Sequence, residues 1–279
     1  MDELYVLARC ALLDALDALG EHRSALVLVG AQAIYLRVGE ADLGITPYTT
    51  DGDLAIDPDR LARTPPLERC LLKTGFRRKS SSSIGEWITE KPMSQKPNVQ
   101  IPIDLLVPAS LSPGTGRRAA RLPGHAEHAT RKVSGLESAL VDSDILQLGA
   151  LDPADTRSHA IRVAGPAALL VAKMFKIHDR TSETDRVRDK DALDVFRLLR
   201  GVSTAEVAER YPRLLASDRS AESSQTALAL LEELFTNRGF GLRMLARAVT
   251  PQLDPVEAQA SCEVLVRRIL ERIGSTFSR

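Results

Sequence analysis

The spacing of hydrophobic residues changes once along the chain and predicts two kinds of structure. Before residue 165, short apolar runs alternate with stretches of helical period, and from Pro166 onwards the period is helical, including 227–235 and 256–273. The elements expected in the earlier part are helices at 3–20, 31–38 and 58–73 and strands at 25–29, 51–56, 76–79, 87–89, 99–107, 142–149 and 159–164.

These elements predict an α/β fold of the α+β kind, with a sheet-forming half before an all-helical half. We expect a mixed sheet flanked by helices in a domain spanning 1–164 and a helical domain spanning 165–279. Pro166 supports this boundary, because proline is favoured in the first turn of a helix. At 279 residues the chain is long enough for two hydrophobic cores.

Two aspartates one residue apart mark the first candidate site. Asp51 and Asp53 flank Gly52 at the start of a predicted strand, and alternate residues of a strand project to one face. Carboxylates held this close repel each other unless a cation lies between them, and hard oxygen ligands suit Mg²⁺ or Mn²⁺. Asp104, in the middle of the predicted strand 99–107, is a third acid for this site.

A turn from strand to helix precedes the two aspartates. The apolar run 25–29 ends at Gly30, and Ala31 opens the predicted helix. The first backbone N–H groups of a helix have no partner inside it and lie at the positive end of its dipole, so they bind phosphate. Gly30 and Ala31 are therefore candidates for nucleotide binding.

Each of these features also has a plain structural interpretation. The segment 51–53 is compatible with an ordinary turn, although the apolar residues 54–56 directly after it favour a strand. Gly30 alone is typical of a glycine at a helix start. Pro102 favours an edge strand, on which Asp104 would be a solvated residue without a chemical role.

A second group of charged residues lies in the helical half. Lys173 interrupts the apolar segment 167–175, and the charged run 188–194 follows it. The plain interpretation is that Lys173 extends to solvent along its aliphatic stem. Asp191 and Asp194 would then form surface ion pairs, each worth about a few tenths of a kcal/mol.

The residues in this order resemble a known family. Gly30 at a strand-to-helix turn, followed by Asp51-x-Asp53 and then Asp104, resembles the DNA polymerase β-like nucleotidyltransferase superfamily. The C-terminal motif is similar to the AbiEii-type and MenT-type toxin nucleotidyltransferases: a helical Lys173, then a basic residue, Asp191, two spacers and an aspartate. The motifs span about residues 25 to 200. The chain departs from the family in the turn, where Gly30-Ala31 replaces Gly-Gly or Gly-Ser and a serine contact to phosphate is lost, and in Gly52, which replaces an apolar residue.

The resemblance implies a magnesium-dependent transfer of a nucleoside monophosphate from a nucleoside triphosphate to an acceptor hydroxyl on a nucleotidyltransferase-like sheet. It implies catalytic roles for Asp51, Asp53, Asp104, Lys173 and Asp191. The first three would hold the metal, and Asp104 would either complete the metal site or help to deprotonate the acceptor. Gly30, Ala31 and Lys173 would bind the nucleotide, and Asp191 would orient Lys173 or act at the acceptor. These residues would line one cleft between the two domains.

Composition sets limits without pointing to a function. Lys and Arg total 37, as do Asp and Glu, so the formal net charge is zero and does not indicate a nucleic-acid-binding protein. The basic cluster of Arg117, Arg118 and Arg121 is a candidate RNA groove. Three distant cysteines show neither disulfide nor zinc spacing. No apolar run approaches ~20 residues and no signal peptide is recognised, so we expect no membrane association and a cytoplasmic protein.

Three functions are compatible with these features. The first is a toxin of a toxin–antitoxin pair that modifies RNA, expected to be the acceptor end of transfer RNA, and that a small antitoxin protein neutralises. The second is a nucleotidyltransferase acting on a small molecule such as an aminoglycoside. The third is a catalytically silent nucleotide-binding domain of the same fold. The neutral charge favours the second over the first, the motif at 173–194 favours the first, and the intact acids argue against the third.

Overall fold

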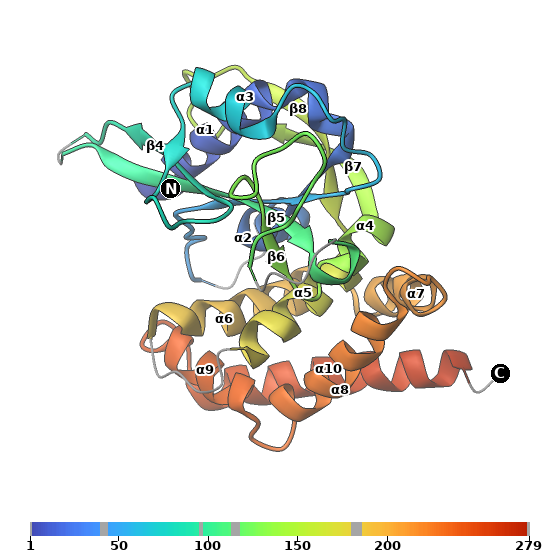
Figure 1. Cartoon of the computed structure of the whole chain (residues 1–279). Helices are drawn as coiled ribbons and strands as arrows, with labels where there is room; N and C mark the ends of the chain where they lie inside the picture. The colour runs from blue at the N-terminus through green and yellow to red at the C-terminus, as the bar shows by residue number, and fades with distance from the viewer. Residues whose placement is uncertain (1, 40–43, 95–96, 113–117, 180–185, 278–279) are drawn as a thin grey trace. The chain divides into compact units, whose positions relative to one another are not determined.

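The computed structural model describes residues 2–39, 44–94, 97–112, 118–179 and 186–277 (Figure 1). The chain forms two compact units. The first unit comprises residues 1–32, 46–136 and 143–164, and the second comprises residues 33–45, 137–142 and 165–279. The predicted boundary between domains 1–164 and 165–279 agrees with the division of the chain after Ala164. The second unit also includes two short earlier segments, 33–45 and 137–142.

The described part of the first unit is built on an eight-stranded mixed sheet with the order β3-β4-β5-β2-β1-β8-β7, and β6 pairs with β5. Its strands are β1 Leu26–Val29, β2 Gly52–Ile56, β3 Arg77–Arg78, β4 Glu86–Lys91, β5 Val99–Pro108, β6 Arg131–Val133, β7 Ser143–Gly149 and β8 Ser158–Ala164. β2 runs antiparallel to β1 and parallel to β5. Every residue of β1 and β2 is buried, so these strands form the centre of the core.

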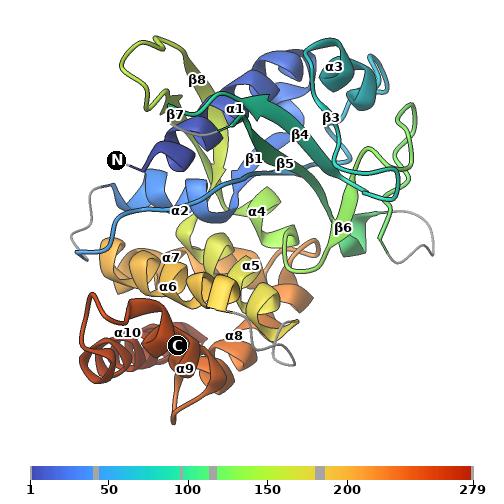
Figure 2. The same ribbon diagram turned by 90° about the vertical axis from the view of Figure 1, so that its left-hand side faces the viewer.

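Helices cover the sheet and connect its strands. α1 (Glu3–Ala18) contacts β2, β4, β5 and β8, and Figure 2 shows it lying across the sheet. α2 (Gly30–Val38) follows β1 directly, and the division between the two units falls within it, after Gln32. The short helices η1 (Gly20–Ala25), α3 (Leu67–Lys73) and η2 (Ala109–Leu111) complete this unit.

The predicted helix at 58–73 is wrong in its first half. α3 begins only at Leu67, and Pro66 is the residue at its N-cap. Two consecutive prolines, Pro65 and Pro66, explain the late start, because a residue before proline is displaced from the helical region of backbone space.

The second unit is helical, as the period after Pro166 predicts. It contains α4 Glu137–Val141, α5 Pro166–His178, α6 Arg186–Gly201, α7 Thr204–Leu215, α8 Ala221–Phe235, α9 Phe240–Val249 and α10 Pro255–Phe277. α10 contacts α6, α7, α8 and α9, and α5 contacts α6, α7 and α8. The expected α+β class is confirmed. Within the described residues, no helix combines the length and the apolar character that crossing a membrane requires.

Candidate functional site

Gly30 brings the start of α2 against the carboxylate of Asp53. Its φ is +70°, and a Cβ at this position would lie 2.0 Å from Oδ2 of Asp53. Both the backbone conformation and the space therefore require glycine. Gly30 is more than a helix-start residue, because it allows the close approach of the helix N-terminus, with the buried Ala31 next in the chain, to an acidic side chain.

Asp51 is held by partly buried polar contacts. The side-chain amide of Gln32 donates to the backbone carbonyl of Asp51 at 2.8 Å, and the Thr49 hydroxyl donates to its Oδ1 at 2.6 Å. Gln32 in turn accepts a hydrogen bond from Nε of Arg9 at 2.8 Å. The first turn of α2 thus fixes the position at which Asp51 enters β2.

Gly52, between the two acids, faces α1. A Cβ there would lie 2.9 Å from Cδ1 of Ile103 and 3.3 Å from Cδ1 of Leu12 in α1. Because successive strand residues alternate between faces, we expect Asp51 and Asp53 to project to the opposite face. The plain interpretation of 51–53 as a turn is wrong, since β2 begins at Gly52.

Asp104 lies beside Asp53 on the neighbouring strand. The parallel pair β2–β5 places Asp53 opposite Asp104, and the antiparallel pair β4–β5 places Glu86 opposite Asp104. Directly opposite residues share a face of the sheet, so Asp53, Asp104 and Glu86 form a row of carboxylates across three strands. The sequence did not identify Glu86, because the register between β4 and β5 is not encoded in a local pattern.

The alternative placement of Asp104 on an edge strand is also wrong. β5 lies inside the sheet, with β2 on one side and β4 and β6 on the other, and the Asp104 side chain is 16% exposed. Pro102 is tolerated because pairing with β2 begins only at Ile103, so at Pro102 the only paired neighbour among the described strands is β4.

Arg131 on β6 holds Asp104 by an ion pair, with Nη2 2.6 Å from Oδ2. Burial raises the pKa of Asp104 to about 7, and the negative charge of Asp53 adds to this effect. The guanidinium of Arg131 opposes the shift, whereas Asp51 and Glu86 add smaller contributions in the same direction as Asp53. A carboxyl group with a pKa near neutrality can accept a proton from a reacting hydroxyl.

A divalent cation fits the chemistry of these donors, because crowding and burial disfavour the negative charges that a cation would neutralise. Asp51, Asp53 and Asp104 supply the oxygen ligands on one face. Among the described residues, however, no group of three or more His, Cys, Asp and Glu side chains is already arranged to hold a metal ion. The carboxylate of Asp104 is paired with Arg131 instead, so the metal site stays a prediction.

Lys173 is enclosed in the second unit and does not extend to solvent. Its ammonium lies 2.6 Å from Oδ1 of Asp191 and 2.7 Å from Oδ2 of Asp194, and its side chain is 4% exposed. Burial alone would lower the pKa of Lys173, but the two carboxylates outweigh burial and raise the pKa above its usual value. Asp191 and Asp194 are themselves buried, so the interpretation as surface pairs is wrong.

The same cluster includes Tyr35 of α2. Its hydroxyl donates to Oδ1 of Asp194 at 3.2 Å, and the guanidinium of Arg197 lies 5.3 Å from the centre of its ring. Burial, followed by the charge of Asp194, raises the pKa of Tyr35 well above its usual value. Lys176 lies 3.4 Å from Asp191 at the more exposed side of the cluster. Tyr35 and Lys176 were not identified from sequence.

The predicted residues thus fall into two sets. Gly30, Asp51, Asp53 and Asp104 lie together in the first unit, and Lys173 and Asp191 lie together in the second. The expectation that all of them line one cleft stays a prediction. Of the predicted RNA groove, Arg117 lies outside the described residues, Arg118 is exposed, and Arg121 pairs with Glu127.

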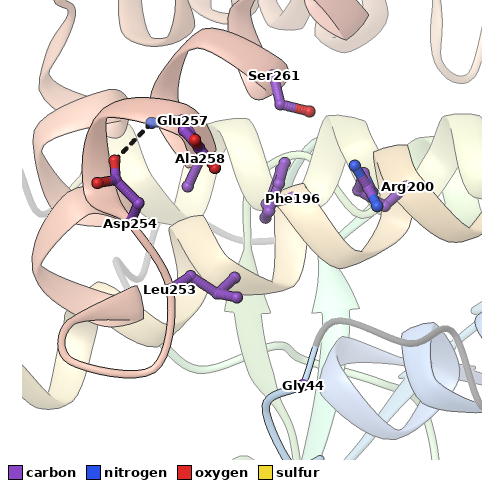
Figure 3. A pocket seen from close by; sticks show the side chains of 8 residues that line it. All are labelled: Gly44, Phe196, Arg200, Leu253, Asp254, Glu257, Ala258 and Ser261. Atoms are coloured by element: carbon purple, nitrogen blue, oxygen red, sulfur yellow. Dashed lines mark hydrogen bonds between the residues drawn. The ribbon is translucent and has the colours of Figure 1, made fainter.

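A pocket of about 440 Å³ lies within the second unit (Figure 3). It is lined by Gly44, Phe196, Arg200, Leu253, Asp254, Glu257, Ala258 and Ser261. Asp254 accepts the backbone N–H groups of Val256 and Glu257, so its own side chain caps the start of α10. None of the site residues predicted from sequence lines this pocket.

Comparisons with known proteins do not assign the chain to a family. Neither a protein-family model nor a curated protein sequence matches it significantly. Among solved structures, the chain is similar to an antigenic nucleotidyltransferase-like protein from Paracoccidioides brasiliensis, with 18% sequence identity and a TM-score of 0.46 over 83% of this chain and 88% of that chain.

Proposed function

We propose that the chain is a magnesium-dependent nucleotidyltransferase that moves a nucleoside monophosphate from a nucleoside triphosphate to an acceptor hydroxyl. One observation carries the proposal. Asp53 and Asp104 are opposite each other on neighbouring strands, and the first residue of α2, Gly30, touches the carboxylate of Asp53. Acidic metal ligands and a helix N-terminus suited to phosphate therefore lie side by side.

The roles follow from the chemistry of each group. Asp51, Asp53 and Asp104 would bind the divalent cation, which when bound neutralises charge on the triphosphate and polarises its α-phosphate. The backbone N–H groups at Gly30 and Ala31 would receive the β- and γ-phosphates. The acceptor oxygen attacks the α-phosphorus, the bond between the α-phosphorus and its bridging oxygen breaks, and pyrophosphate leaves. In its alternative role, in which it does not complete the metal site, Asp104 would accept the acceptor proton, and its raised pKa suits it as a base.

For the second unit, we propose that Lys173 acts on the triphosphate and that Asp191 orients it. In the structure the ammonium donates to Asp191 and Asp194, and because an ammonium has three donors, these two contacts do not use its full donor capacity. The contacts with Asp191 and Asp194 position the ammonium, and they also make Lys173 a structural residue of this unit.

We further propose that the acceptor is RNA, with transfer RNA the expected substrate, and that the protein is a toxin neutralised by a small antitoxin protein. The support is the resemblance of the lysine–aspartate motif at 173–194 to toxin nucleotidyltransferases. The zero net charge is the observation that favours a small cationic acceptor instead, because no general positive field attracts RNA.

The test is a transfer assay with each of the four nucleoside triphosphates labelled at the α-phosphate, Mg²⁺ or Mn²⁺, and either total cellular RNA or a set of aminoglycosides. We expect label in RNA, loss of labelling with Asp53→Asn, and full labelling with Asp59→Asn, which changes an exposed acid after the same strand. Labelled aminoglycoside with unlabelled RNA would move the assignment to the small-molecule class. Equal labelling by the Asp53 variant and the wild type would refute the site.

A further inference from the structure

The ion pair between Arg131 and Asp104 leaves part of the arginine unsatisfied. One N–H of the guanidinium, on Nη2, donates to Oδ2 of Asp104 at 2.6 Å. Nε of Arg131 is buried and has no hydrogen-bond partner among the described residues. A buried donor without a partner costs free energy, so this position of the guanidinium does not use its full binding capacity.

The backbone of Arg131 is closely packed, whereas its side chain is partly exposed. A Cβ at Gly85 would lie 2.6 Å from the backbone nitrogen of Arg131 and 2.7 Å from the carbonyl oxygen of Leu105, so three segments pack tightly there. The Arg131 side chain is nevertheless 33% exposed. The guanidinium is therefore attached at a rigid point and has access to solvent, which allows it to exchange its partner.

Asp104 is the carboxylate that Arg131 holds in the structure. It is flanked on neighbouring strands by Asp53 and Glu86, and Arg131 supplies the positive charge that the structure places against it. A divalent cation bound to Asp104 would neutralise the carboxylate in place of Arg131, with a larger positive charge. The guanidinium would then be released at the edge of the site, with its planar fork available for phosphate oxygens.

We propose that Arg131 is a nucleotide-binding residue of this site, which leaves Asp104 when the cation binds and then contacts the phosphates of the nucleoside triphosphate. The inference rests on the proposed function and adds a residue that the resemblance did not include. It predicts opposite effects of Arg131 on two ligands, because the arginine competes with the cation and assists the nucleotide.

The experiment measures binding to the full chain without turnover. Mn²⁺ affinity is measured by electron paramagnetic resonance in the absence of nucleotide, and affinity for a non-hydrolysable triphosphate analogue by calorimetry in saturating Mg²⁺. For Arg131→Ala we expect Mn²⁺ to bind about tenfold tighter and the analogue about tenfold weaker than to the wild type. Lys132→Ala is the matched control, because it removes a charge from the adjacent position of β6, whose side chain alternates to the other face.

Circular dichroism establishes that the variants are folded. If the alanine variant is not folded, Arg131→Gln replaces it, because glutamine keeps a polar group and part of the aliphatic stem but has no positive charge. Unchanged affinities for both ligands in a folded Arg131 variant, with a wild type that transfers nucleotide, would overturn the inference and leave the proposed function standing. Weaker binding of both ligands would also overturn it, since Arg131 would then only support the fold of the site. A wild type that binds neither Mn²⁺ nor the analogue would overturn both proposals.

Discussion

Replacing Lys173 by methionine tests whether the charged cluster of the second unit is buried. The substitution keeps an unbranched apolar side chain that is one atom shorter, and it removes the ammonium that lies 2.6 Å from Asp191 and 2.7 Å from Asp194. Two carboxylates inside the helical unit then lose their principal counter-ion. Asp191 retains Lys176 at 3.4 Å, and Asp194 retains the Tyr35 hydroxyl at 3.2 Å.

The expected loss is about 3–5 kcal/mol in the free energy of unfolding, the usual result of removing one partner from a buried ion pair. Lys176→Met, on the same helix, is the matched control and should cost less than about 1 kcal/mol, because its side chain is 34% exposed. Adding Asp191→Asn to Lys173→Met should recover part of the loss, since it removes one of the unpaired charges.

Urea unfolding followed by two probes separates the units. The chain has one tryptophan, Trp87, which is fully buried in β4 of the first unit, whereas far-UV circular dichroism mainly reports the helices. The helical transition of Lys173→Met should shift to lower urea, and the Trp87 fluorescence transition should shift with it only if the two units unfold together. A loss below about 0.5 kcal/mol would refute the reasoning and favour a solvent-exposed lysine.

Three further outcomes are expected. Gly30→Ala should abolish transfer and destabilise the chain by about 2–4 kcal/mol, because φ is positive at this position and the new Cβ would overlap Asp53. Gly75→Ala is the control: φ is +88° there and no neighbour lies within 4 Å, so thermal unfolding should show the cost of the backbone conformation alone. Asp104 has a pKa of about 7 in the folded chain against an ordinary 3.8, so its contribution to stability is largest below pH 4 and is lost as pH rises to 7. Denaturant titrations across this range should show the free energy of unfolding falling by at most about 4 kcal/mol through this group, and Asp104→Asn should remove that fall. An unchanged pH dependence in the variant would assign it to other groups. Labelling of RNA should fall steeply with added KCl, whereas labelling that is insensitive to salt would exclude extensive phosphate contacts.

The sequence predicted most of the fold because its apolar runs are unambiguous. The central strands β1 and β2 are buried along their whole length and appear as continuous apolar segments. The short strand β6 was missed because none of its three residues is buried, so it has no hydrophobic pattern. The predicted start of α3 was too early, because Pro65 and Pro66 delay the helix until Leu67.

The chemistry was predictable where it depends on alternation and not where it depends on distant pairing. Alternation along the strand identified Asp53, which the structure places opposite Asp104, whereas a common face for Asp51 and Asp53 stays a prediction. The contact between Arg131 and Asp104 was not predicted, because it joins two strands and residues 27 positions apart. The burial of Lys173 likewise depends on carboxylates 18 and 21 residues later on another helix, which no local period reveals.

The central claim is that the carboxylates of the first unit transfer a nucleotidyl group, and the position of the transferred label tests it most directly. The same nucleoside triphosphate is supplied labelled at the α-phosphate or at the γ-phosphate, with Mg²⁺ and the acceptor. The account predicts that α-label enters the acceptor, that γ-label leaves as pyrophosphate, and that Asp53→Asn abolishes both. Transfer of the γ-label to the acceptor, or undiminished α-labelling by the Asp53 variant, would contradict it.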